Sequence, residues 1–431
     1  MNHTDTTFKA GVARREISPP QPSLLKPTGM GRPHPTRGVL DPLYSEALAL
    51  SVGEETALLI TADLRTYQYP WLLEVRERVS RQTGVDPARI LFSCTHNHCS
   101  SPMPADDSPE AAAAEEEANR VILQGLVDSC CAAYDNRRPA EIAATTTHLA
   151  ATIGENRRLR FSSGLCLNGW GAGGIVPPGQ KIVGPAGPDS TRLDLCFIRE
   201  PGVDHPFAVL TSYATHPHMY ELPAFSGEFP GAAKRILGDR VPGAIILHAT
   251  HACGDIDIHT VHPMPDDPDE KIAWFRRSID RVGSPFADAV MDSLSSARYT
   301  RPRTLRTDIF TTEQPDSSPD RRVYTLSAVA LDDIAFLSMP GELFHELGLL
   351  VHDESPFAHL NLMAYNGTGR AYLATPLAFE QGSYEVMRGP APRAPDGDAL
   401  APIPTRAGAQ VETGVRIAEE ASALLRRLHR T

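Results

Sequence analysis

The sequence has no run of about 18 uncharged apolar residues, and its first residues, MNHTDTTFKAGVARR, lack the apolar segment of a secretory signal. It has no block of lysine or arginine, and 53 acidic against 41 basic residues give a net charge of −12. A surface that binds phosphate backbones needs clustered positive charge. The sequence therefore predicts a cytoplasmic protein with no nucleic-acid partner and no membrane insertion.

Cysteine is scarce, with seven residues and no CxxC pair. Without paired spacing, neither a disulfide framework nor a zinc knuckle is indicated, and we expect reduced thiols. Cys94, Cys99 and Cys253 lie beside histidine-containing segments. Each is either a small apolar core residue or a candidate catalytic thiol, and the sequence favours the core.

Strand-like and helix-like segments alternate along the chain. Apolar, β-branched runs predict strands at 57–64, 88–98, 193–200, 207–218, 243–252 and 325–342. Capping residues and amphipathic spacing predict helices at 69–84, 108–136, 269–282 and 409–430. No interdomain linker and no internal repeat are evident beyond the histidine motifs. We expect a mixed α/β fold, with β-sheets layered with helices, as a single large domain over 1–431.

The dipeptide Thr-His recurs at the ends of three predicted strands, in CTHNH (94–98), ATHPH (214–218) and ATHAC (249–253). Residues i and i+2 of an extended segment point to the same side, so His96 and His98 can reach one point. A lone histidine at a strand end is ordinarily a satisfied polar residue. The recurrence instead favours a shared metal site, because strand ends are where sites assemble in α/β sheets.

A metal held by two histidines normally needs a carboxylate as a third protein ligand. The segment MPGE (339–342) places Glu342 after an apolar strand and at the start of a predicted helix. This glutamate is either the third ligand or a residue that complements the helix dipole, and local sequence leaves both open. Two imidazoles and a carboxylate suit zinc, manganese or iron(II), and we expect one zinc ion per chain.

Six segments together resemble the amino-terminal catalytic domain of the neutral/alkaline non-lysosomal ceramidase family: DPLYSEALAL (41–50), CTHNH, ATHPH, CGDID (253–257), MPGE and YLATPLAFEQGSYEV (372–386). Their order gives a family-like core over 9–390, followed by the amphipathic helix at 409–430. The resemblance implies amide hydrolysis by a zinc-activated water. It also implies that His96, His216, Glu342 and Tyr372 hold the zinc.

The resemblance also suggests roles for polar residues near the predicted metal. Tyr372 is either a weak fourth ligand or a hydrogen-bond donor to the tetrahedral oxyanion. His98 is placed to act as a general acid or as a substrate anchor. Asp255 and Asp257 either bind hydroxyl or amine groups of the substrate or act as a general base beside the metal.

The sequence departs from the family at one catalytic position. Asp257 stands where ceramidases have a serine that is needed for catalysis, and an ionised carboxylate cannot donate the hydrogen bond of that serine. The immunoglobulin-like carboxy-terminal domain of full ceramidases is also not found in the sequence. We therefore predict hydrolysis of a small, polar amide, ester or lactone. The alternative is a degenerate family member that binds a ligand without turnover.

Four further residues are predicted to contact this small-molecule substrate: Arg157, Arg370, His218 and His251. Arginines near a site can anchor carboxylates or hydroxyls, although a surface ion pair is the alternative for each. His218, His251 and His259 are also candidates for orienting the metal ligands. The sequence leaves a homo-oligomer open.

Overall fold

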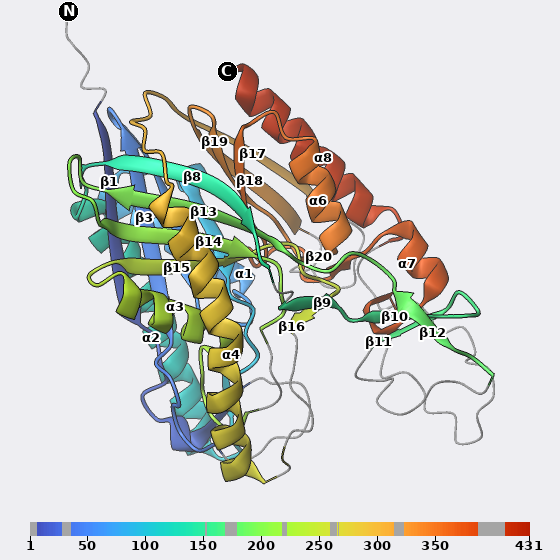
Figure 1. Cartoon of the computed structure of the whole chain (residues 1–431). Coiled ribbons are helices and arrows are strands. Elements are labelled where there is room, and N and C mark those ends of the chain that lie inside the picture. Colours follow the sequence, from blue (N-terminus) through green and yellow to red (C-terminus); the bar gives the residue numbers. More distant parts are fainter. Residues whose placement is uncertain are drawn as a thin grey trace, which may run out of the picture.

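The computed structural model describes residues 7–27, 36–150, 153–168, 179–217, 222–258, 265, 267–313, 323–386 and 410–431. Three main sheets, with helices on their outer sides, form the body of the molecule (Figure 1). This arrangement confirms the mixed α/β fold class. The predicted residues His218 and His259 lie outside the described ranges.

Each main sheet mixes antiparallel and parallel pairing. The first has the order β5-β4-β3-β1-β7, the second β15-β14-β13-β8 and the third β17-β18-β19-β21. Their strands are β1 (Phe8–Glu16), β3 (Tyr44–Val52), β4 (Glu55–Ala62), β5 (Ile90–Cys94), β7 (Arg138–Pro139), β8 (Glu141–His148), β13 (Arg192–Arg199), β14 (Pro206–Tyr213), β15 (Ile245–Thr250), β17 (Leu305–Glu313), β18 (Val323–Leu331), β19 (Ile334–Ser338) and β21 (His359–Met363).

The three sheets are built from the same order of elements. In each, three neighbouring antiparallel strands that follow one another in chain order are followed by a helix and then by a strand that pairs parallel with the third; short strands of other sheets are inserted between β1 and β3 and between β8 and β13. The connecting helices are α1 (Tyr69–Thr83), α3 (Glu228–Arg240) and α6 (His345–Asp353). The expectation of no internal repeat concerned the sequence, and the topology of the three segments is nevertheless repeated. The three Thr-His dipeptides of the histidine motifs do not mark this repeat, because one lies at the end of β5, two lie at the ends of β14 and β15, and the segment from β17 to β21 has none.

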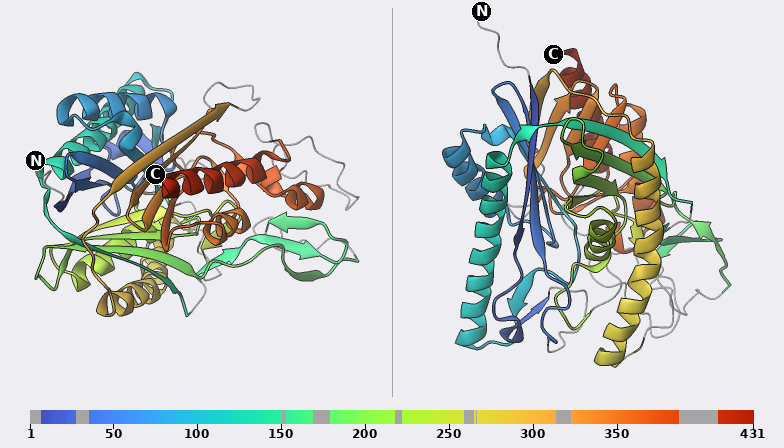
Figure 2. Two further views of the ribbon diagram at one scale, coloured as in Figure 1. Left: turned by 90° about the horizontal axis from the view of Figure 1, so that it is seen from above. Right: turned by 60° about the vertical axis from the view of Figure 1, so that its left-hand side comes forward.

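A second helix follows each repeat and packs beside the first. These are α2 (Pro109–Asp135), α4 (Pro268–Ser295) and α8 (Thr413–Arg430), which contact α1, α3 and α6 respectively. Figure 2 shows these helices on the outside of the sheets. The inner faces share one apolar core, to which the three sheets contribute Leu48, Leu50, Leu210, Leu247, Val329 and Phe336. The strand residues that alternate with these point to the other face of each sheet and pack against the helices. Because both faces are buried, the strands have continuous apolar sequences.

Short strands complete the structure near one end of the three sheets. They form the pairs β2 (Leu25–Pro27) with β6 (Pro102–Pro104), β9 (Gly154–Asn156) with β16 (Ile256–Ile258), and β20 (Glu342–Leu343) with β22 (Tyr372–Leu373). A three-stranded sheet of β10 (Arg158–Phe161), β11 (Cys166–Asn168) and β12 (Ile182–Pro185) projects from the body beside α7 (Pro376–Gln381) (Figure 1). Three short 3-10 helices lie at Pro22–Leu24, Pro87–Arg89 and Tyr384–Val386.

Element boundaries differ from the sequence prediction in several places. The predicted strands 88–98 and 207–218 end at Cys94 and Tyr213. The expectation that His96 and His98 lie on one extended segment is therefore wrong, because both follow the end of β5 and His96 has a left-handed φ of 56°. The run 325–342 forms two strands, because Asp332 adopts a left-handed φ of 49° and starts a tight hairpin between β18 and β19. Helix α4 continues past the predicted end at 282 to Ser295, with Pro285 inside it. Within the part of the chain that is described, no helix combines the length and apolar character needed to cross a membrane.

Candidate metal centre

The three predicted ligands come from the three main sheets. His96 follows the end of β5, His216 follows the end of β14, and Glu342 follows the end of β19 as the first residue of β20. Each of these strands belongs to a parallel pair, and ligand sites in such sheets form beyond the carboxyl ends of the strands. The repeated topology therefore brings one ligand from each sheet to a common end of the molecule.

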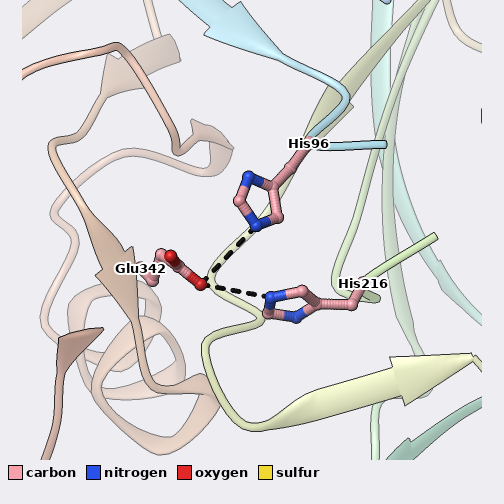
Figure 3. Close-up of side chains that lie close together, drawn as sticks. All are labelled: His96, His216 and Glu342. Carbon is pink, nitrogen blue, oxygen red and sulfur yellow. Dashed lines mark hydrogen bonds and ion pairs between the residues drawn. The ribbon is translucent and has the colours of Figure 1, made fainter. Parts of the chain in front are cut away.

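The three side chains converge on one point (Figure 3). The Oε2 atom of Glu342 lies 3.2 Å from Nε2 of His216 and 3.5 Å from Nε2 of His96. The two imidazole ring centroids are 4.9 Å apart. His96, His216 and Glu342 each offer one ligand atom, and all three atoms lie within 4.8 Å of one another.

His216 is held as a neutral imidazole whose Nε2 faces the carboxylate. Its Nδ1 lies 2.7 Å from the carbonyl oxygen of Cys253 and 3.0 Å from that of Ile256, so Nδ1 carries the proton and donates it. Burial, followed by the positive charge of Arg157, lowers the pKa of His216 to about 4. At neutral pH its Nε2 therefore presents a lone pair toward Glu342.

His96 is fixed in the same tautomer by a different segment. Its Nδ1 lies 2.6 Å from the carbonyl oxygen of Arg65, so this nitrogen also donates and Nε2 is left as the acceptor. The backbone of His96 has a left-handed φ of 56°, a conformation that costs a non-glycine residue about 1–3 kcal/mol. The ring of Tyr365, itself at a φ of 59°, lies against the imidazole with the centroids 4.1 Å apart.

Two glycines allow the backbone to present Glu342. Gly341 has a φ of 63°, and a Cβ there would lie 2.6 Å from the carbonyl oxygen of Gly369. A Cβ on Gly254 would clash with the carbonyl oxygen of Glu342 itself. Burial raises the pKa of Glu342, whereas His96 and His216, in their protonated forms, lower that pKa well below its usual value. With both rings neutral, the carboxylate instead faces two further acceptors.

The hydrogen-bond donors and acceptors of His96, His216 and Glu342 are arranged as a cation-binding site requires. Both Nδ1 protons are donated to backbone carbonyls, so two Nε2 lone pairs and a carboxylate oxygen face one another with no proton to share. A bound divalent metal would offset the repulsion among these three acceptors. Histidine ligands of metals usually donate the N–H of their other ring nitrogen to a carbonyl or carboxylate, as both Nδ1 atoms do here. The donor set suits zinc as a catalytic site with three protein ligands.

A second group with ligand-type residues does not have this character. Asp194, His251 and His352 also offer atoms within 4.8 Å of one another. However, Nδ1 of His251 accepts the backbone N–H of Ala252 at 2.7 Å, so its Nε2 carries the proton. That Nε2 lies 2.8 Å from Nε2 of His352, and the proton is donated there. The group is a hydrogen-bonded cluster that joins β15 to α6.

Tyr372 lies beside Glu342, because β20 and β22 pair in parallel with these two residues in register. Its phenol oxygen accepts a hydrogen bond from Nη2 of Arg157 at 3.2 Å. The same guanidinium donates to Oδ1 of Asp257 at 3.1 Å and to Oε1 of Glu385 at 2.8 Å. The structure thus joins three of the predicted residues, Tyr372, Arg157 and Asp257, through one buried arginine.

The remaining predicted catalytic residues have different surroundings. The His98 ring lies 5.1 Å from that of His96 and 6.2 Å from that of His216, between centroids. Asp255 is engaged on both carboxylate oxygens, which accept the side-chain amide of Asn156 at 2.8 Å and the backbone N–H of His345 at 2.7 Å. His98 therefore borders the centre, whereas Asp255 fastens the start of α6.

Two predicted substrate-binding residues lie apart from this network. Arg370 is exposed, two residues before Tyr372. His251 is buried in the cluster with His352, whose ring lies nearly in the same plane, with the centroids 5.0 Å apart. Contact of either residue with a substrate stays a prediction.

Sequence reasoning missed several residues that support the centre. Buried Glu228, at a left-handed φ of 47°, accepts the backbone N–H of His98 at 2.8 Å and so fixes the CTHNH turn. Tyr365 and Glu385 were also missed. Tyr365 belongs to YNGTG (365–369), a turn signal that marks a loop but not its contact with His96.

The cysteines near the histidine motifs are core residues. All seven are unpaired, and Cys94, Cys99 and Cys253 are buried. Burial raises the pKa of the Cys94 thiol to about 12 and that of Cys253 well above its usual value. Because a nucleophilic cysteine acts as its thiolate, these pKa values oppose a catalytic role for Cys94 and Cys253.

Comparison with solved structures finds the same fold in ceramidases. The neutral ceramidase of Pseudomonas aeruginosa superposes with a TM-score of 0.71 at 12% sequence identity, covering 99% of this chain and 75% of that one. A ceramidase complexed with C2 gives a TM-score of 0.69 at 12% identity, covering 98% and 76%. No family model and no curated protein matches the sequence. The chain therefore has a ceramidase-like fold with a candidate metal site at its strand ends.

Proposed function

We propose that the protein is a zinc-dependent hydrolase that cleaves an amide, ester or lactone bond of a small polar substrate with an activated water. The convergence of two Nε2 lone pairs and one carboxylate, each anchored in a different sheet, carries this proposal. The ceramidase-like fold supports it, because the family that the sequence resembles hydrolyses amides at such a centre.

His96, His216 and Glu342 would hold the ion. When bound, zinc polarises a carbonyl group and lowers the pKa of a water molecule toward neutrality. Tyr372 is the residue of this chain proposed to stabilise the oxyanion. Its oxygen already accepts a hydrogen bond from Arg157, which directs the phenol proton elsewhere. His98 is proposed to transfer protons to and from the reacting groups, and Asp257 either does the same or binds a hydroxyl or amine group of the substrate.

The test combines metal content with turnover. Purified protein should contain about one zinc ion per chain by elemental analysis, with manganese and iron measured in the same sample. It should hydrolyse at least one member of a panel of small amides, esters and lactones, and His96→Ala should lose both metal and turnover. Glu346→Gln is a matched control, since this exposed carboxylate lies four residues after Glu342.

One observation favours a second function, binding without turnover. Asp257 occupies the position of the catalytic serine in the family that the sequence resembles, and it is engaged by Arg157. A protein that retains zinc but hydrolyses no member of the panel would support the binding function and contradict the hydrolase.

A further inference from the structure

Next to the proposed metal site, four charged side chains form one network: Arg157, Arg158, Asp257 and Glu385. The two positively charged side chains in this network are buried. Arg157 and Arg158 are 2% and 3% exposed at the side chain, and Glu385 is 0% exposed. The side chain of Asp257 is 12% exposed. Of these four side chains, the one most accessible to solvent is therefore acidic.

Arg157 has little capacity left for a substrate. A guanidinium has five N–H donors. Here Nε donates to Glu385 at 2.8 Å, Nη1 to Asp257 at 3.1 Å, and Nη2 to both the Gly254 carbonyl at 2.8 Å and the Tyr372 phenol at 3.2 Å. The arginine acts as a buried support for Asp257 and Tyr372, so an anionic substrate gains little from it.

Asp257 is positioned next to the metal ligands. It forms a parallel β-bridge with His216, and residues paired in this way have side chains on the same face. The guanidinium of Arg157 also ties it to Tyr372, which is in register with Glu342. A group attached close to the scissile carbonyl of a bound substrate would therefore lie near the Asp257 carboxylate.

From this arrangement we infer that the substrate carries a protonated amine near the scissile bond, and that Asp257 selects it through a charge-assisted hydrogen bond. The inference rests on the proposed zinc hydrolase and narrows its substrate class. The alternative is a substrate that carries a carboxylate. Arg370 would favour such a substrate, because it is exposed, positively charged and two residues from Tyr372.

Three hydroxamates of similar size and different charge separate these possibilities. β-Alanine hydroxamate is cationic, butanehydroxamate is neutral and succinic monohydroxamate is anionic, and all three share the same zinc-binding group. Dissociation constants are measured by titration calorimetry on the zinc-loaded full chain, so the result does not depend on turnover. We expect the cationic probe to bind about tenfold more tightly than the neutral one, and the anionic probe to bind most weakly.

Two variants complete the design. Asp257→Asn keeps an acceptor for Arg157 but removes the negative charge, so this variant should lose the preference for the cationic probe. Glu346→Gln removes a negative charge elsewhere and should keep that preference. If Asp257→Asn does not fold, the order of the three affinities in the wild type still decides. Equal affinities, tightest binding of the anionic probe, a preference that survives in Asp257→Asn, or no binding of any probe would overturn the inference.

The outcomes also separate the inference from the proposed function. Cation preference without turnover of any panel member would retain the inference and contradict the hydrolase. Turnover with no charge preference among the probes would do the reverse. Protein that takes up no zinc contradicts both.

Discussion

Acidification should destabilise the fold through His248, a buried imidazole outside the metal centre. His248 packs against Phe229 and Phe286, with ring centroids 5.8 and 5.9 Å away, and its Nδ1 lies 2.9 Å from the hydroxyl of Thr211. Burial, followed by the charge of Lys234, lowers its pKa from 6.5 to about 3. Because the unfolded chain binds the proton first, stability falls as the pH drops below 6.5 and stops falling near the folded pKa of about 3.

The loss from His248 between about pH 7 and pH 5 is about 2 kcal/mol, from the difference in proton binding between the two states. Urea unfolding followed by circular dichroism at both pH values measures it. His248→Gln should reduce the pH-dependent loss by about 2 kcal/mol, whatever its cost at pH 7. Thr211→Val, which removes the hydrogen bond but keeps the imidazole, should retain most of the pH dependence. Parallel pH profiles for the wild type and His248→Gln would refute the assignment.

Three further predictions concern the centre itself. Glu342→Gln should abolish zinc retention on a desalting column, and the wild type should gain about 3 kcal/mol of stability at zinc concentrations 100-fold above its dissociation constant; retention of a full equivalent by the variant would contradict the ligand set. Gly341→Ala should cost at least about 2 kcal/mol, measured by urea unfolding, because φ is 63° and the added Cβ meets the carbonyl of Gly369. Cys94 and Cys253 should not react with a thiol reagent until the protein unfolds, since both are buried; rapid labelling of the native protein would show that these sites open.

The sequence was sufficient to select the three candidate ligands that the fold brings together, because they lie at recognisable boundaries. His96 and His216 follow apolar runs that form strands, and Glu342 follows the glycine turn of MPGE. His251 has the same local signal, yet its ring pairs with His352 on α6. A Thr-His dipeptide after an apolar run therefore indicates the end of a strand, whereas the direction of the ring depends on packing between elements far apart in the chain.

The supporting residues and the repeat could not be predicted, for related reasons. Glu228 reaches the backbone of His98 across 130 positions, and Glu385 reaches Arg157 across 228. No local pattern encodes such pairs. Each of the three sheets buries an inner and an outer face, and many apolar sequences satisfy that demand, so a shared topology leaves little trace in the sequence.

The three proposed ligands come from successive repeats, so metal uptake at this site would depend on how much of the chain has been synthesised. A nascent polypeptide that has emerged only through β15 contains both imidazoles but no Glu342, and the strand that completes the last parallel pair ends at Met363. In the proposed site, the ion would therefore meet its third ligand only after Glu342 has been synthesised and the final sheet has docked.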